Sequence, residues 1–189
     1  THYFAPTTLR QFYKPWRYRY SPSGNSLRSN RITIIFTRRH INIESITASE
    51  SEIDGIHRYT IVVKEPKEVV RKVVSQIEKQ IEVVKAFYHA DSEVVYQEIA
   101  LYKLPTKMIA SGGDAERIVR AHHARILTIE SEFTILEKTG YPEEIKDLFN
   151  ELKPFGLLEF VRSGRVAISK PMKTLEEHII DMNDQKIKA

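Results

Sequence analysis

Hydrophobic and polar positions along the first half of the chain predict a group of alternating helices and strands. The segment after Pro66 carries valine and isoleucine at steps of three and four residues, the spacing of an amphipathic helix. Shorter apolar runs on either side of the Asp54-Gly55 turn read as strands. The expected elements are a helix at 28–39, strands at 41–49 and 57–63, a helix that begins at Pro66, and a strand at 83–90.

The second half repeats the same order of elements. Pro142 opens a segment with apolar residues at i, i+3, i+4 and i+7, and Pro154 and Gly156 end it. The expected elements are a strand at 93–104, a helix at 114–123, a strand pair within 125–138, a helix that begins at Pro142, and strands at 157–161 and 165–169, joined through 162–164.

This repetition predicts an α+β fold with two ferredoxin-like βαββαβ modules, each with two helices on one face of a sheet. The first module has no identified opening strand. We therefore expect it to lack a sheet strand and to be the less stable of the two. Residues 171–189 are polar and read as a tail.

Composition excludes several classes of protein. The chain has 189 residues, of which 41% are hydrophobic and 29% charged, the balance of a soluble globular protein. It has no cysteine, which removes disulfide scaffolds, cysteine-ligated metals and thiol catalysis. No run approaches the roughly 18 apolar residues of a membrane span.

The positive charge is confined to one end. Residues 1–43 hold eight basic residues and no acidic one, whereas the rest of the chain is mildly acidic. The sequence therefore does not support a positive electrostatic field over the whole protein that would attract nucleic acid. Residues 1–29 are also rich in aromatic residues and proline. This segment fits an arm for single-stranded nucleic acid, a targeting peptide, or a terminus without function, and the last interpretation is favoured.

Candidate catalytic chemistry is sparse. Adjacent His122 and His123 point about 100° apart on a helix and cannot chelate one metal together. The Ser111-Gly112-Gly113-Asp114 segment lacks the spacing of a phosphate-binding loop and reads as a loop in which Asp114 caps the next helix. The residues therefore favour a binding or regulatory protein with no catalytic residues and no metal site.

Several segments resemble one family. Residues 31–45, which include Arg38-Arg-His-Ile-Asn42-Ile-Glu-Ser45, and residues 55–60 resemble the ACT domain of acetolactate synthase small subunits. Residues 98–101, 125–127 and 161–169 are similar to that family's carboxy-terminal domain. The resemblance covers about residues 30–170. It divides the chain into an atypical segment (1–29), an ACT domain (30–91), a carboxy-terminal small-subunit domain (92–170) and the polar tail (171–189).

The resemblance implies a cytoplasmic regulatory subunit without an active site. Such a subunit activates the catalytic subunit of acetolactate synthase, which would carry the thiamine diphosphate, Mg²⁺ and FAD, so that this chain needs no cofactor. It forms a homodimer through its ACT domains and mediates feedback inhibition by valine in branched-chain amino acid synthesis. Neither nucleic acid nor a membrane is an expected partner.

The resemblance also carries one effector contact onto this sequence. The family's valine-binding asparagine at the entry to the second strand matches Asn42, and neighbouring Ile41 and Ile43 are expected to add apolar surface. Without the resemblance, Asn42 would read equally well as a turn residue.

The sequence departs from the family over about residues 14–31, where the family's first strand and Asn-x-x-Gly turn are expected. We hypothesise that residues 1–29 are not native family sequence, as a reading-frame error or a wrong gene start would produce, and that the effector loop is missing. Two alternatives remain at this stage: an amino-acid-sensing ACT protein for another partner, and a nucleic-acid-binding protein with a basic arm.

Overall fold

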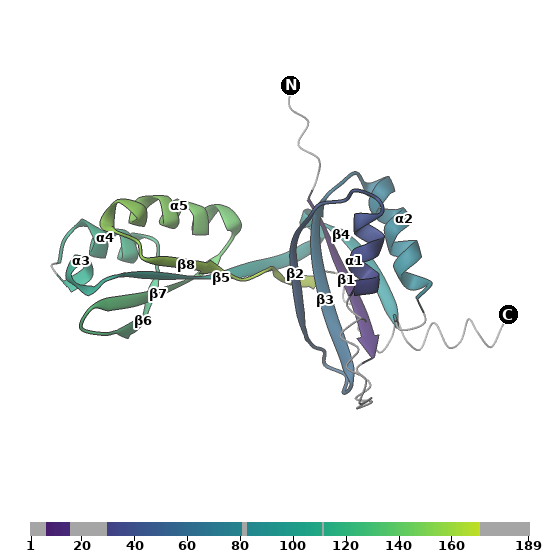
Figure 1. The fold of residues 1–189 in the computed structure, drawn as a ribbon, viewed down its shortest axis with the longest axis horizontal. Helices are drawn as coiled ribbons and strands as arrows, with labels where there is room; N and C mark the ends of the chain where they lie inside the picture. The colour runs from purple at the N-terminus through teal and green to yellow at the C-terminus, as the bar shows by residue number, and fades with distance from the viewer. Residues whose placement is uncertain (1–6, 16–29, 81–82, 111, 171–189) are drawn as a thin grey trace, which may run out of the picture. The chain divides into compact units, whose positions relative to one another are not determined.

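A computed structural model describes residues 7–15, 30–80, 83–110 and 112–170, which divide into two compact units (Figure 1). The first unit comprises the chain up to Val95 together with the chain from Ala167 onward. The second unit comprises Tyr96 to Val166. The predictions for most of the 1–29 segment and for the polar tail at 171–189 lie outside the described residues.

The first unit is a four-stranded antiparallel sheet with two helices. Its elements are β1 (Thr7–Pro15), α1 (Asn30–Thr37), β2 (Ile43–Glu50), β3 (Ile56–Lys64), α2 (Lys67–Glu78) and β4 (Lys85–Ala90), followed by a 3₁₀ turn at Asp91–Glu93. The strand order is β2-β3-β1-β4. Gly55 adopts a φ of 75° in the turn between β2 and β3, a conformation that glycine adopts without a steric cost.

The opening strand of this unit is β1, so the expectation that the module lacks one is wrong. β1 pairs antiparallel with β3 on one side, from Thr7 opposite Lys64 to Pro15 opposite Ile56. On its other side it pairs with β4 over residues 8–13. A strand in this central position supplies hydrogen bonds to both neighbours, which would otherwise be left with unpaired backbone groups.

The second unit repeats this architecture. Its elements are β5 (Val94–Pro105), α3 (Thr106–Ala110), α4 (Asp114–Ala121), β6 (Arg125–Ile129), β7 (Phe133–Gly140), α5 (Pro142–Leu152), a 3₁₀ turn at Lys153–Phe155, and β8 (Glu159–Arg162), after which comes β9 (Val166–Ser169). The strand order is β6-β7-β5-β8, and β9 also pairs with β5. Both sheets thus have the 2-3-1-4 order of a ferredoxin-like unit, which confirms the predicted fold class.

Each unit has its own apolar core between the sheet and its helices. Four aliphatic residues of α2 face the first sheet, because they recur at the helical period: Val70, Val73, Val74 and Ile77. In the second unit Ile145, Leu148 and Leu152 of α5 do the same. The apolar spacing that predicted these helices is therefore the spacing that fills the two cores.

The helix ends follow local chemistry, with one correction. Pro142 is the first residue of α5, and the backbone N–H of Tyr141 donates to Glu144 Oε2 at 2.7 Å. The sequence predicts that Asp114 is the N-cap residue of α4. In the structure Gly113 is the N-cap, and Asp114 is the first residue within the helix. The Asp114 carboxylate instead forms an ion pair with Arg117, one turn later, at 3.1 Å.

Candidate functional site

Among the residues that the structure describes, the candidate functional side chains from the sequence lie apart from one another and do not form a single site. No group of three or more histidine, aspartate and glutamate side chains there is arranged to hold a metal ion. Within the same residues, no helix has the length and apolar character needed to cross a membrane.

The predicted effector residue Asn42 follows a tight turn at the end of α1. His40 adopts the left-handed conformation, with φ of 55°. Its N–H donates to the carbonyl of Thr37, and the N–H of Ile41 donates to the carbonyl of Phe36, both at 3.0 Å. This pair of bonds, with the apolar contact between its first and last residues, is the Schellman motif that ends many helices.

The motif fixes which side chains turn inward. Ile41 is only 6% exposed and packs with Phe36 in the core, and Ile43 is half-buried against the same cluster. Asn42 lies between them and is exposed. Its amide is thus held at a rigid helix-to-strand junction, where it can donate to and accept from a bound molecule. Of the three predicted effector residues, Asn42 is the one that the fold presents to solvent.

The second unit ends its first long helix, α4, with the same turn. His123 has φ of 53°, its N–H donates to the carbonyl of Arg120 at 3.0 Å, and the N–H of Ala124 donates to Val119 at 2.9 Å. The preceding residue, His122, places Nε2 3.0 Å from Glu151 Oε1. The two adjacent histidines thus have separate structural roles, one in the turn and one in a contact with α5.

The position equivalent to Asn42 in this second turn is Arg125. Its guanidinium contacts the Glu137 carboxylate, with distances of 3.0 Å from Nε and 2.9 Å from the terminal nitrogen. The two modules therefore share a turn but differ in the side chain that follows it: an exposed neutral amide in one, and a paired cation in the other.

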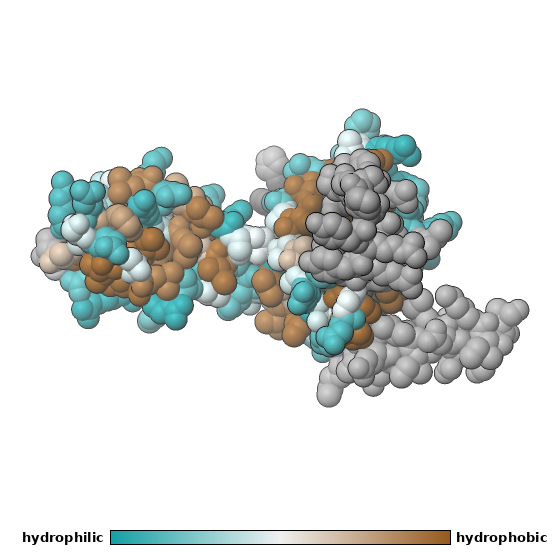
Figure 2. All heavy atoms as spheres, turned by 60° about the horizontal axis from the view of Figure 1, so that its bottom comes forward, coloured by the Kyte–Doolittle hydropathy of each residue, from teal (hydrophilic) through white to brown (hydrophobic). Residues whose placement is uncertain are grey.

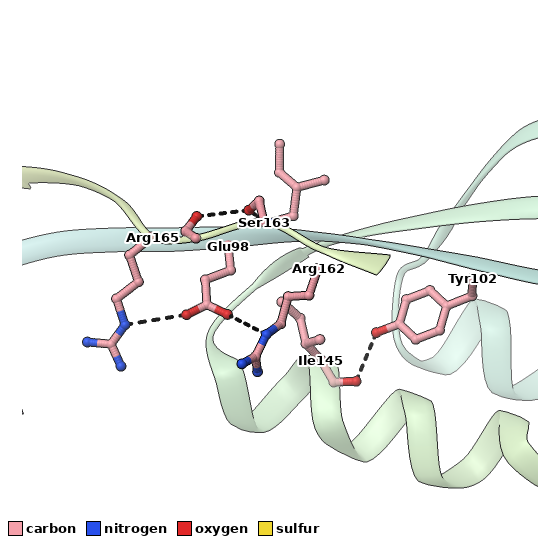
Figure 3. Close-up of polar contacts among 8 residues, drawn as sticks. Glu98, Tyr102, Ile145, Arg162, Ser163 and Arg165 are labelled. Atoms are coloured by element: carbon pink, nitrogen blue, oxygen red, sulfur yellow. Dashed lines mark hydrogen bonds and ion pairs between the residues drawn. The ribbon is translucent and has the colours of Figure 1, made fainter. Parts of the chain in front are cut away.

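A second arrangement of polar groups surrounds Glu98 on β5 (Figure 3). The Glu98 side chain is 6% exposed and receives two arginines: Arg165 Nε lies 3.4 Å from Oε1, and Arg162 Nε lies 3.3 Å from Oε2. Arg165 is itself buried, with its guanidinium carbon 4.2 Å from the ring centroid of Tyr96. A buried carboxylate is tolerated here because cations compensate it.

An irregularity between Arg162 and Arg165 makes this arrangement possible. In a regular strand, residues three positions apart point to opposite faces, yet both arginines reach the same carboxylate. Ser163 maintains the pairing across the irregularity: its N–H donates to the Ile99 carbonyl at 2.8 Å, and its hydroxyl accepts from the Ile99 N–H at 2.9 Å. The Arg-Ser-Gly-Arg segment therefore anchors the end of the second unit to β5.

Tyr102, four residues further along β5 than Glu98, joins the sheet to α5. Its hydroxyl donates to the carbonyl of Ile145 at 2.8 Å (Figure 3). Burial raises the pKa of the Tyr102 phenol well above its usual value, and the positive charge of Arg162 acts in the opposite direction without cancelling that effect. The phenol is therefore neutral and acts as a hydrogen-bond donor throughout the physiological range.

The sequence singles out both the 98–101 and the 161–169 segments as similar to the family, but it gives no direct indication that Glu98 pairs with Arg162 and Arg165. One signal could have revealed it. Glu98 falls in the same alternating phase of β5 as Ala100, Tyr102 and Leu104, all of which are fully buried. A carboxylate in the buried phase of a strand needs a cation, and the chain offers arginines at 162 and 165.

Comparison with known proteins gives the same family over both units. Residues 30–85 match the ACT domain of acetolactate synthase small subunits, and residues 97–171 match a model described as the small subunit of acetolactate synthase. The chain is 33% identical to the acetolactate synthase small subunit of Bacillus subtilis over 142 residues, 75% of this chain and 82% of the relative. It is 30% identical to a probable acetolactate synthase small subunit of Methanothermobacter thermautotrophicus over 145 residues, 77% of this chain and 86% of that one.

A solved structure shows the same fold. The acetolactate synthase small subunit of Thermotoga maritima superimposes with a TM-score of 0.73 at 24% identity, covering 88% of this chain and 99% of that one. The strand orders of both units are therefore those of a known architecture.

Proposed function

Because the chain belongs to the family of acetolactate synthase small subunits, we propose that it is a regulatory subunit that binds an acetolactate synthase catalytic subunit and raises its activity. Catalysis, which joins two pyruvates or pyruvate and 2-oxobutyrate, is assigned to the catalytic subunit, together with thiamine diphosphate, Mg²⁺ and FAD. The observation that carries the proposal is that the family match spans both folded units. The proposed site of action is the cytoplasm.

A binding role agrees with how the two units use their side chains. Both cores are filled by aliphatic and aromatic residues, and the buried polar groups Glu98, Arg165 and Tyr102 have partners inside the fold. These groups hold strands and helices together and are not directed at a substrate. The exposed surfaces are therefore where this chain meets its partners.

We assign the response to valine to Asn42. The support for this is positional: its amide is exposed, its backbone is fixed by the Schellman turn, and Ile43 supplies a half-buried apolar neighbour. Ile41 contributes by holding the turn from the core. An amide can pair with both the amino and the carboxylate group of an amino acid.

The proposed homodimer forms through the first unit. β2 is an edge strand of the described sheet, and apolar side chains are exposed on it and on α1, namely Ile46 and Ile34. An edge strand with exposed apolar neighbours is suited to pairing with the same edge of a second copy. Such pairing would bring Asn42, at the start of β2, close to the partner's first unit.

A pull-down with the cognate catalytic subunit tests the proposal. The immobilised chain is expected to retain the catalytic subunit, and an excess of free chain is expected to release it. The resin without the chain is the control. If the chain retains no catalytic subunit, the proposal fails, and the alternative of an independent amino-acid-sensing ACT protein is favoured instead.

A further inference from the structure

The sheet of the first unit is buried on the face that points away from α1 and α2. Ile61 and Val63 of β3 belong to the core beneath these helices, and Thr60 and Val62 alternate with them along the strand. Thr60 and Val62 therefore point to the opposite face, yet they are only 4% and 1% exposed. An antiparallel sheet commonly leaves such a face to water, so this burial indicates that a further part of the chain covers it.

The same face continues onto both edge strands of this sheet. Phe87 and His89 of β4 alternate with residues that pack in the core, and their rings stack with centroids 6.2 Å apart. On β2, Thr47 lies opposite Thr60, and its hydroxyl is buried without a hydrogen-bond partner among the described residues. Thr47, Thr60, Val62 and Phe87 are called here the rear face. Figure 2 shows that the described part of this unit carries hydrophobic surface.

The described chain ends beside this sheet. The last described residue, Lys170, is fixed to the 3₁₀ turn that follows β4. Its backbone N–H donates to the carbonyl of Glu93 at 2.9 Å, and its ammonium group donates to the carbonyl of Ser92 at 2.6 Å. Because β4 is an edge strand of the sheet, the nineteen residues at 171–189 continue from this edge.

The sequence of these nineteen residues contains the pattern of an amphipathic helix. Thr174-Leu-Glu-Glu177 matches the capping box with which many helices begin. Leu175, Ile179 and Met182 then follow at i, i+4 and i+7, the spacing of one face of a helix. A helix over 175–186 would be about 18 Å long, and four strands span about 14 Å from edge to edge. One such helix is therefore long enough to cross the sheet.

We propose that residues 175–186 form a helix that packs on the rear face of the same chain, with Leu175, Ile179 and Met182 against the sheet. Attachment at the β4 edge gives the segment a high effective concentration there, so a short apolar stripe is sufficient. The segment lies beyond the family match, which ends at residue 171, and the proposal is independent of the regulatory role. The acidic residues of the segment occupy the other positions of the helix, toward water: Glu176, Glu177, Asp181 and Asp184.

The absence of cysteine in this chain allows a direct test, because a single introduced thiol reports whether the rear face is covered. Thr47→Cys and Phe87→Cys place the thiol on two different strands of that face. Ser75→Cys, on the exposed side of α2, is the control for general reactivity. The rate of labelling by a maleimide is measured for each full-length variant, alone and combined with Ile179→Asp. Gln185→Asp is the matched control, since it adds the same charge on the polar side of the proposed helix.

We expect Ile179→Asp to speed the labelling of Thr47→Cys and Phe87→Cys roughly tenfold, the shift that loss of one buried isoleucine side chain gives, and Gln185→Asp to leave it unchanged. Ser75→Cys should label at one rate in every background. If Ile179→Asp leaves the two rear-face thiols protected, or if they label as fast as Ser75→Cys without it, the proposal is overturned. Protection that is lost on dilution would assign the cover to a second copy, and protection that requires the catalytic subunit would assign it to that subunit. Either result also overturns the proposal.

Discussion

At the scale of single residues, Asn42 is the side chain on which the proposed valine response depends. Asn42→Ala is expected to weaken valine inhibition of the holoenzyme and to leave activation of the catalytic subunit unchanged, because the residue is exposed and lies outside the core. Loss of a hydrogen bond to a charged group costs about 1.5–3 kcal/mol, roughly a 10- to 150-fold shift in the concentration of valine required.

Inhibition curves for the wild type and for two variants measure this shift. Arg125→Ala is the matched control, since it alters the equivalent position after the same turn in the second unit. An Asn42→Ala variant that keeps the wild-type valine curve would return Asn42 to the status of a turn residue.

Glu98 is the residue whose loss should cost the most stability in the second unit. Glu98→Gln removes the carboxylate that the buried Arg165 guanidinium contacts, and breaking a buried pair in this way costs about 3–5 kcal/mol. Urea denaturation measures the difference. The control is Glu159→Gln, which removes an exposed partner of Lys103 and should cost less than about 1 kcal/mol. Equal losses for the two variants would show that the Glu98 cluster does not anchor the end of the unit.

The buried phenol of Tyr102 is expected to make the free energy of unfolding depend on pH in the alkaline range. Burial raises the pKa of its phenol in the folded chain above the value near 10 in the unfolded chain. Its contribution to stability is therefore complete below about pH 10 and declines as the pH rises further, because the unfolded chain then loses a proton that the folded chain retains. Tyr102→Phe should lose less stability between pH 9 and 11 than the wild type, although it costs about 1 kcal/mol at pH 8. Urea denaturation at several pH values measures both proteins, and parallel losses would contradict this expectation.

At the scale of elements, α1 and α4 both end in a left-handed histidine where glycine is the usual residue. A β-carbon in that conformation costs about 1–2 kcal/mol, and the extra freedom of glycine in the unfolded chain offsets about 0.5–1 kcal/mol of the gain. His40→Gly and His123→Gly are each expected to raise the free energy of unfolding by about 0.5–1 kcal/mol.

Thermal and urea denaturation test this, with His122→Gly as the control. His122 has φ of −85° and contacts Glu151, so glycine there removes a contact without relieving strain and should destabilise. If His40→Gly is destabilising as well, its side chain has a role beyond the turn.

Comparison of the predicted and observed elements shows which local sequence signals were sufficient to predict a helix or a strand. α2 and α5 were predictable because a proline start and apolar residues at helical spacing coincide in each. The strand β1 was not, because Thr-Thr-Leu-Arg-Gln-Phe-Tyr-Lys-Pro lacks a regular alternation, and its two neighbouring strands define its position. The Arg162–Gly164 connection reads as a turn in sequence, yet the strands before and after it both pair with β5.

The candidate site was only partly predictable for a related reason. A short sequence motif was enough to select Asn42 as a candidate. The turn at the end of α1, which only the structure shows, leaves Asn42 exposed and Ile41 buried. The Glu98 cluster joins residues more than sixty positions apart, so no local pattern could define it.

At the scale of the whole molecule, the chain joins two ferredoxin-like units, each with a distinct role. The first carries the proposed effector turn and dimer edge, and the second carries a buried ionic anchor. Each unit contains a match to one family of subunits, over residues 30–85 and 97–171, so the central claim concerns regulation of a separate catalytic chain.

The most direct test of this claim is acetolactate formation from pyruvate by the cognate catalytic subunit, supplied with its cofactors, as this chain is added in increasing amounts. We predict a saturable rise in turnover to a plateau, and no acetolactate from this chain alone. Turnover that does not change at saturating concentrations of the chain, or acetolactate made without the catalytic subunit, would contradict the claim.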